Sequence, residues 1–266
     1  MDKASTIERQ KVIIRELEIK HKVGVVELAS KLNVTPETIR KDLSVLEKEK
    51  RLRRIHGGAI QHSQILKEPH FNKKLGIFDY QKQVIGEAAA TFIMDGDVLA
   101  LDVGTTAFHI ARSIKNVKNV TIVTNSLAAA DILNIRLENH LFDGRIIVIG
   151  GNSNPLQRSF SGSLTNQMLE EFYFDKAFIS CGGISKEGIC DFDADEAKAS
   201  SIMIERSNQV FVVADASKIH QKAFYRIGSF FSIDYLISNT EAPDEWSKEI
   251  KLAKVEWIKA GGRGEG

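Results

Sequence analysis

The sequence predicts two domains of different fold class. Residues 1–60 are expected to form an N-terminal α(+β) winged helix-turn-helix domain, and residues 81–260 a C-terminal α/β domain with a mostly parallel sheet. Short helical patterns and a basic Gly-Gly tract predict the first domain. Apolar strand-like runs that alternate with helical stretches predict the second. Between them, residues 61–80 show no clear periodicity and contain Pro69, so we expect a linker there.

The front of the chain carries the pattern of two helices, a tight turn and a later wing. Apolar spacing from Ile7 to about Ile19 predicts the first helix, and "VGVVELASKLNV" begins with a short β-like run before a second helix. Asn33 and Val34 supply the tight turn that ends it. The later tract "RLRRIHGGAI" alternates weakly around a Gly-Gly pair, which is typical of a small two-stranded wing.

A third helix is predicted to begin after Thr35. A threonine hydroxyl at the N-cap accepts a first-turn backbone N–H, and Pro36 suits the first helical position because no N–H is lost there. Ile39, Leu43 and Leu46 follow at helical spacing and are expected to face inward.

Two short helices joined by a tight turn, with polar residues on the exposed face of the second, define a helix-turn-helix. Its second helix enters the major groove of DNA. Arginine bonds guanine bidentately, hydroxyls bond phosphates or bases, and flanking cations bond phosphates without choosing a sequence. The predicted DNA-binding residues are Thr35, Glu37, Thr38, Arg40, Lys41, Arg51, Arg53 and Arg54.

The charge distribution agrees with a DNA-binding head. Residues 1–60 hold 14 Lys+Arg against 9 Asp+Glu, whereas the remainder of the chain is mildly acidic. A solvated helical surface is compatible with this charge alone. Two cysteines, Cys181 and Cys190, are expected to be free thiols, and neither a metal site nor a cofactor is expected. No signal peptide or membrane-spanning run is expected, so we expect a cytoplasmic protein without a membrane partner.

The second part of the chain alternates strand-like and helical patterns. A parallel sheet covered by helices on both faces is therefore expected. Its strand candidates lie at residues 98–102, 120–124, 145–150, 176–180, 209–215 and 235–239.

Polar residues and glycines follow these strands directly. In open α/β sheets, ligands bind beyond the carboxyl ends of the strands, where glycine permits close backbone approach and a helix N-terminus favours an anion. Any one of these loops alone is more often a turn and a helix cap. Together they predict a small polar pocket for a phosphorylated or polyhydroxylated ligand. The glycine pattern fits neither a dinucleotide-binding nor an ATP-binding loop.

The head sequence "VVELASKLNVTPETIRKDLSVLEKEKRLRRIHGGA" resembles the winged helix-turn-helix of DeoR-family transcriptional regulators. The resemblance implies a recognition role for the group Thr38, Ile39, Arg40, Lys41 and Asp42. The family usually has glycine where this chain has Lys50, so the end of the recognition helix is expected to differ locally.

The stretches "IGEAAATFIMDGDVLALDVGTT", "IVTNSL", "VIGG", "FISCGGISKEGICDFDADEAKASSIMIERS" and "VVADASK" are similar to the sensor domain of the same family. This similarity implies a fold like that of ribose-5-phosphate isomerase and a phosphorylated sugar or polyol as effector. The similarity places ligand contacts on several strand-end residues, with Glu196 as a weaker candidate. The glycine loops add three further residues, Gly150, Gly151 and Gly182. The expected effector-binding residues are Asp102, Gly104, Thr105, Thr106, Thr124, Asn125, Gly150, Gly151, Gly182, Glu196 and Lys218.

We therefore expect a transcriptional regulator, with no catalytic residues, that represses a sugar, polyol or amino-sugar operon until a phosphorylated sugar relieves it. A homodimer or homotetramer would hold the heads on repeated half-sites of a double-stranded operator. One alternative is a sugar-phosphate isomerase with an accessory head. Asp102, Asp191, Asp193 and Glu196 would then be candidate bases, although no spacing marks one of them. The other alternative is a winged helix that binds a protein instead of DNA. The basic pairs Arg40-Lys41 and Arg53-Arg54 disfavour this alternative.

Overall fold

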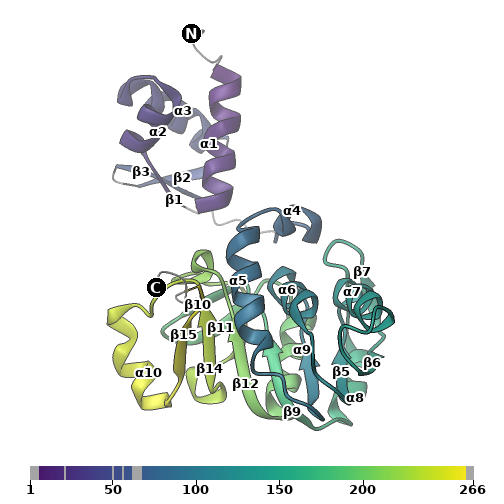
Figure 1. Ribbon diagram of the computed structural model, residues 1–266. Coiled ribbons are helices and arrows are strands. Elements are labelled where there is room, and N and C mark those ends of the chain that lie inside the picture. The colour runs from purple at the N-terminus through teal and green to yellow at the C-terminus, as the bar shows by residue number, and fades with distance from the viewer. Residues whose placement is uncertain (1–5, 21, 50, 56, 62–67, 262–266) are drawn as a thin grey trace, which may run out of the picture. The chain divides into compact units, whose positions relative to one another are not determined.

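The computed structural model describes residues 6–20, 22–49, 51–55, 57–61 and 68–261, and Figure 1 shows their elements. The chain divides into two compact units, Met1–Leu66 and Lys67–Gly266. No helix in the described ranges is both long and apolar enough to cross a membrane.

The first unit is a winged helix-turn-helix, as predicted. Its three short strands form one antiparallel sheet in the order β1-β3-β2, so the wing has a third strand that was expected only as a β-like run. Lys50, where the sequence departs from the family pattern, lies outside the described residues. The elements in chain order are α1 (Thr6–Lys20), β1 (Lys22–Gly24), α2 (Val25–Leu32), α3 (Pro36–Lys48), β2 (Leu52–Ile55) and β3 (Gly58–Gln61).

The buried face of α3 holds this unit together. Ile39, Leu43 and Leu46 are fully buried in one core with residues of α1, α2 and the strands. Asp42 is also buried, and its two carboxylate oxygens accept hydrogen bonds from Arg9 of α1 at 2.8 and 3.2 Å. Ile39 is buried as its spacing predicts, and Asp42, to which the resemblance also gives a recognition role, faces the core of the head instead of the exposed surface.

The second unit is built on a seven-stranded sheet in which every neighbouring pair is parallel. All six predicted strands are present, and a seventh, β15, was not predicted. The spatial order is β15-β14-β12-β9-β4-β5-β6. The strands are β4 (Val98–Leu101), β5 (Val120–Thr124), β6 (Gly144–Val148), β9 (Phe174–Ile179), β12 (Ser207–Val213), β14 (Tyr235–Ser238) and β15 (Glu256–Lys259).

Helices cover both faces of this sheet (Figure 1). Side chains alternate along each strand, so Leu99 and Leu101 pack into one apolar core and Ala100 into the other. The first core is completed by α5 (Asp79–Ala90), α6 (Thr105–Ser113) and α7 (Leu127–Glu138). The second is completed by α8 (Ser163–Glu170), α9 (Ala194–Glu205) and α10 (Ser247–Ala253).

Short hairpins beyond the parallel sheet were not predicted. One joins β7 (Asn152–Asn154) to β8 (Ser159–Ser161), and another small sheet joins β10 (Gly183–Ser185), β11 (Gly188–Asp191) and β13 (Tyr225–Gly228). The 3₁₀ helices η1 (Ala216–Lys218), η2 (Phe230–Ser232) and η3 (Asp244–Trp246) complete the unit.

The expected linker is partly helical. Residues 62–67 lie outside the described part of the chain, but α4 (Phe71–Leu75) falls within the expected linker and α5 begins at Asp79. Phe71 is buried, its ring lies 5.9 Å from that of Phe108, and its backbone N–H donates to the Leu156 carbonyl at 2.8 Å. Five helical residues are too few to show a periodic pattern, so only tertiary packing reveals this element.

Gly86 allows α5 and α6 to pack closely. A Cβ at this position would lie 2.6 Å from the His109 carbonyl carbon and 2.7 Å from its oxygen. We expect Gly86→Ala to force the helices apart and to destabilise the unit by about 1–3 kcal/mol, which thermal unfolding would measure. Gly76→Ala is the control, because nothing lies within 4 Å of its Cβ position. Equal melting temperatures for the two variants would contradict the prediction.

Candidate DNA-binding surface and effector site

The recognition helix begins as its sequence predicts. Thr35 is the N-cap of α3 and its Oγ1 accepts the Thr38 N–H at 3.2 Å, while Pro36 fills the first turn. The two threonine hydroxyls also lie 2.9 Å apart and bond each other. Thr35 is exposed and Thr38 half-buried, so their hydroxyls lie at the start of the helix, where recognition helices meet base edges.

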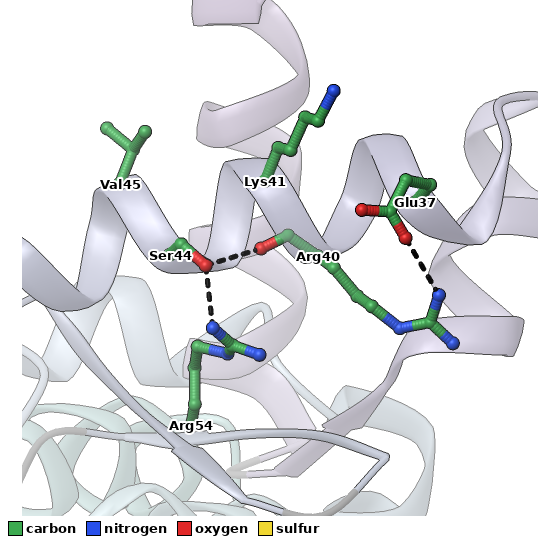
Figure 2. Close-up of a pocket in the computed structure, with 6 residues that line it drawn as sticks. All are labelled: Glu37, Arg40, Lys41, Ser44, Val45 and Arg54. Carbon is green, nitrogen blue, oxygen red and sulfur yellow. Dashed lines mark hydrogen bonds and ion pairs between the residues drawn. The ribbon is translucent and has the colours of Figure 1, made fainter.

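The charged residues of α3 have different orientations. Arg40 extends along the helix side and pairs with Glu37 at 3.1 Å, so the carboxylate holds the guanidinium in place (Figure 2). Lys41 and Val45 project together from the opposite side of the helix (Figure 2), and Val45 is 44% exposed. The outward face of α3 thus offers a cation beside an apolar group. In a major groove these groups suit a base edge and a thymine methyl.

The wing contributes a further cation. Arg54 of β2 donates to the Ser44 hydroxyl at 2.6 Å, and its backbone N–H donates to Glu47 at 2.7 Å (Figure 2 shows the first bond). Arg51 is exposed, with Glu49 at 3.5 Å. The side chain of Arg53 lies outside the described part. Arg54 therefore shares one surface with the outward side of α3.

In the second unit, the strand order reverses between β4 and β9, which is where a ligand site is expected. The chain builds one half of the sheet outward from β4 through β5 to β6, and the other half outward from β9, so the order reverses between these neighbours. In open α/β sheets, ligands bind at such a switch point, beyond the carboxyl ends of the strands. Asp102 and Gly104 follow β4, and Ser180 and Gly182 follow β9.

The N-terminus of α6 opens at this switch point. Gly104 is its N-cap, with φ 105°, and glycine has no side chain that could cap the helix. Thr105 and Thr106 form its buried first turn, and the Cβ of a larger residue at 104 would lie 3.3 Å from Ser180. The buried Oγ of Ser180 has no hydrogen-bond partner in the described part of the chain. Uncapped N–H groups beside an unpartnered hydroxyl suit an anion such as phosphate.

Asp102 joins the ends of β4 and β9 to α9. Its carboxylate accepts the Ser180 N–H at 3.1 Å and the Ser200 hydroxyl at 3.0 Å. Burial, with Asp191 and Glu196 nearby, raises the pKa of Asp102 well above its usual range. A carboxyl group in this position can exchange hydrogen bonds with sugar hydroxyls.

Two more buried acids, Glu196 and Asp191, lie close to Asp102. Glu196, in the first turn of α9, accepts the Ser159 hydroxyl at 2.5 Å. Burial, with Glu68 and Asp191 nearby, raises the pKa of Glu196 to about 7. Asp191, at the end of β11, has a pKa of about 6, raised by burial and by Glu68. Both acids therefore change protonation near neutral pH.

Lys218 brings a positive charge close to the buried acids of the site. It ends η1, which Asp215 caps by accepting the Ser217 N–H at 2.9 Å. Lys218 is half-buried and close enough to lower the pKa of Asp191. Asp102, Glu196 and Lys218 are therefore all close enough to Asp191 to interact with it electrostatically.

Other predicted site residues have visible packing roles. Gly151 has φ 154°, and a Cβ there would lie 2.0 Å from Thr165 Oγ1, which donates to the Gly150 carbonyl at 2.8 Å. A Cβ at Gly182 would lie 2.7 Å from the Phe192 ring. These glycines are required by neighbouring side chains, and their contact with an effector stays a prediction.

Thr124 ends β5, which lies directly beside β4, and Asn125 follows it. Thr124 pairs with Leu101 in the sheet, and its hydroxyl accepts the Ser126 N–H at 3.0 Å. Asn125 donates to the Phe160 carbonyl at 2.8 Å, while its buried Oδ1 has no partner within the described residues. Asn125 therefore keeps one acceptor for a ligand.

Sequence reasoning missed several polar groups at this site. Ser180 ends a predicted strand, as Asp102 ends another, so the same rule could have found it. Ser200 lies within a helix, and Lys74 and Glu68 lie in the expected linker, so no local signal marked them. Asp193, weighed as a candidate base, caps α9 by accepting the Glu196 N–H at 3.0 Å. Across the described ranges, no group of three or more potential ligands could hold a metal ion.

A DNA-reading head and an α/β unit with a polar site at its switch point define a ligand-responsive transcriptional regulator. Two family models match the chain: the DeoR-like helix-turn-helix domain over residues 9–64 and the DeoR C-terminal sensor domain over residues 79–240. The chain belongs to the DeoR family of transcriptional regulators.

Curated relatives agree with this assignment. An uncharacterized HTH-type transcriptional regulator of Staphylococcus epidermidis is 41% identical over 79% of this chain and 83% of the relative. The regulator YulB of Bacillus subtilis is 34% identical over 93% of this chain and 94% of its own length. The glycerol-3-phosphate regulon repressor of Haemophilus influenzae is 30% identical, covering 96% of this chain and 97% of the repressor.

Solved structures show more distant likeness. Ribose-5-phosphate isomerase A of Methanocaldococcus jannaschii aligns with a TM-score of 0.38 and 19% identity, over 55% of this chain and 56% of the isomerase. A translation initiation factor of Pyrococcus horikoshii aligns with a TM-score of 0.40 and 14% identity, over 83% and 69% of the two chains. The fold assignment rests on the strand order of this chain.

Proposed function

We propose that this protein is a cytoplasmic repressor of an operon for using a sugar, polyol or amino sugar, and that a phosphorylated sugar relieves it. The observation that carries the effector proposal is the uncapped N-terminus of α6, beside the unpartnered Ser180 hydroxyl and buried Asp102. Relatives named as glycerol-3-phosphate regulon repressors support the repressor role.

Each part of the site has a distinct task in this proposal. The first turn of α6, with Thr105 and Thr106, holds the phosphate by N–H groups and hydroxyls. Asp102 and Asn125 bond sugar hydroxyls, and Lys218 neutralises part of the phosphate charge. The effector releases DNA because it binds more tightly to the arrangement of heads and sensors that does not fit the operator.

An oligomer places two or more heads on the operator. Recognition helices in such assemblies read half-sites spaced by about one helical turn of DNA or its multiples. Thr35, Thr38, Arg40 and Lys41 read base edges or nearby phosphates, while Arg51, Arg53 and Arg54 bond phosphates. We propose a homodimer or homotetramer, which light scattering on the purified chain would measure.

The alternative is a sugar-phosphate isomerase with an accessory head. An isomerase needs a carboxylate base above its substrate. Asp193 caps α9 and is not placed as such a base. Asp102, Asp191 and Glu196 are the acids that an isomerase could use. Incubation of the purified chain with phosphosugars tests this point, because product formation would favour the enzyme.

A thermal-shift screen tests the effector proposal. The panel is ribose 5-phosphate, fructose 1-phosphate, glycerol 3-phosphate and glucosamine 6-phosphate, each with its unphosphorylated counterpart. A bound effector stabilises the sensor according to its affinity and concentration. We expect one phosphorylated compound to stabilise the chain and to release its operator. A chain that responds to none of them would contradict the proposed effector class.

Lys218→Ala is expected to weaken the response to that effector. The variant loses a cation of the site but leaves the head unchanged, so operator affinity without effector should be preserved. We expect about tenfold more effector to be needed for operator release, measured by fluorescence anisotropy, because a charge-assisted hydrogen bond contributes about 1.5–3 kcal/mol. Lys222→Ala, an exposed lysine four residues further on, is the control. An unchanged effector requirement for Lys218→Ala would show that the site is misplaced.

A further inference from the structure

The α4 segment packs beside the proposed phosphate site. Phe71 contacts Phe108 in the first turns of α6, and the Arg158 guanidinium lies 5.7 Å from the Phe71 ring centroid. The Pro69 carbonyl accepts a hydrogen bond from Gln157 at 3.3 Å. Helix α4 is therefore joined both to α6 and to the turn that connects β7 and β8. That hairpin also bonds Glu196 through Ser159.

Lys82 fixes the end of α4. Its ammonium is buried and donates to the Lys74 and Ile77 carbonyls, both at 2.7 Å. Burial lowers the pKa of Lys82 to about 8, against the opposing effect of Asp215, so it stays mostly charged at about pH 7. The carbonyls at the end of α4 are thereby bound by a cation from α5.

A nearly buried ion pair extends from this segment. Lys74 and Glu68 form an ion pair, with side chains only 13% and 14% exposed. Glu68 raises the pKa of both Asp191 and Glu196, and Lys74 lowers them, so the pair lies within electrostatic reach of the effector-site acids. Neither family model covers residues 65–78, which include this pair.

Several acids lie close to the few cations of this region. Glu68, Asp102, Asp191 and Glu196 are within electrostatic reach of one another, and Lys218 and Lys74 act on Asp191, so an arriving anion is favoured where one of these lysines turns toward it. The Lys74 ammonium is carried on a flexible stem, whereas the end of its helix is fixed by Lys82. Movement of the side chain alone can exchange one anionic partner for another.

We propose that α4 forms a wall of the effector site and that Lys74 contacts the anionic group of the effector, leaving Glu68 when it does so. This inference rests on the proposed effector function. It makes the first described element after the head a participant in ligand binding. Glu68 competes with the effector for Lys74. The strength of the ion pair therefore sets the effector concentration at which the regulator responds.

Two substitutions with opposite expected effects test the exchange. In Lys74→Met the cation is lost but the aliphatic stem is kept, and we expect at least about tenfold weaker binding. In Glu68→Gln the competitor is lost, and we expect binding at least about threefold tighter. Titration calorimetry of the full chain would use the phosphosugar of the panel that stabilises the parent most. Lys73→Met, at an exposed position on the same helix, is the control and should leave the affinity unchanged.

A purely structural ion pair gives a different result. Both substitutions would then lower the melting temperature and weaken binding in the same direction, which would overturn the exchange. Unchanged affinity in folded Lys74→Met would overturn the contact itself. The double variant Glu68→Gln/Lys74→Met removes both charges and is expected to bind like Lys74→Met, because no cation remains to be released. If the parent binds no phosphosugar, the proposed function fails, and this inference fails with it.

Discussion

Replacing Arg40 and Lys41 together with alanine is expected to weaken operator binding at least about 100-fold. A contact to a base edge contributes about 1–3 kcal/mol, and about 1.4 kcal/mol corresponds to tenfold in affinity. Lys41 projects freely from α3, and the Glu37 carboxylate holds Arg40 along its side (Figure 2). Neither side chain contributes to the buried core of the head, so the variant should remain folded.

The measurement is fluorescence anisotropy with operator fragments selected from a random library, at several salt concentrations. If either residue bonds a phosphate, its removal should reduce the salt dependence of binding by about one unit of slope. The charge-matched control is Lys11→Ala with Arg15→Ala, which removes two exposed cations of α1. An equal loss of affinity in both double variants would mean that net charge, and not the α3 surface, accounts for binding.

Glu196→Gln is expected to stabilise the sensor at about pH 8 by up to about 3 kcal/mol and to flatten its dependence on pH. The folded protein raises the pKa of Glu196 from 4.5 to about 7, mainly by burial, and one pKa unit corresponds to about 1.36 kcal/mol. Between these values the folded state binds more protons at this site than the unfolded state. Stability contributed by this group therefore falls as pH rises from about 4.5 to about 7, and levels off above.

Glutamine removes this penalty because it carries no charge at any pH, and its amide oxygen can still accept the Ser159 hydroxyl. Melting temperatures between about pH 5 and pH 8 should therefore show a smaller fall for Glu196→Gln than for the parent. Glu205→Gln, at the exposed end of the same helix, is the control. Parallel pH profiles for the parent and Glu196→Gln would rule out the raised pKa.

Prediction from sequence succeeded where local chemistry or long patterns decide the structure. Thr35 and Pro36 start α3 where their cap chemistry requires it, and Ile39, Leu43 and Leu46 are buried as their spacing indicates. The six strands of the parallel sheet were visible because each is an apolar run of ordinary length. The strand-end rule put Asp102 and Gly104 at the carboxyl end of a strand, and the strand order then shows that this end lies at the switch point.

Prediction from sequence failed where a residue's role depends on a partner that is distant in the chain. Asp42 follows two exposed bases and resembles part of the reading surface, but Arg9, 33 residues earlier, binds it inside the head. Residues 71–75 have too short a pattern to predict a helix, and Phe71 packs on Phe108 only after α6 has formed. The roles of Ser180 and Ser200 likewise require β4, β9 and α9 to meet.

The sequence by itself determined the class of protein: a basic helix-turn-helix head, an α/β body with polar strand ends, and a family resemblance over nearly the whole chain. Only the tertiary structure decided which acids raise one another's pKa, and that α4 packs against α6 beside the proposed effector site. The physical reason is that caps and apolar periodicity act between near neighbours in the chain. Desolvation and charge pairing act between groups that only folding brings together, such as Glu68 and Glu196.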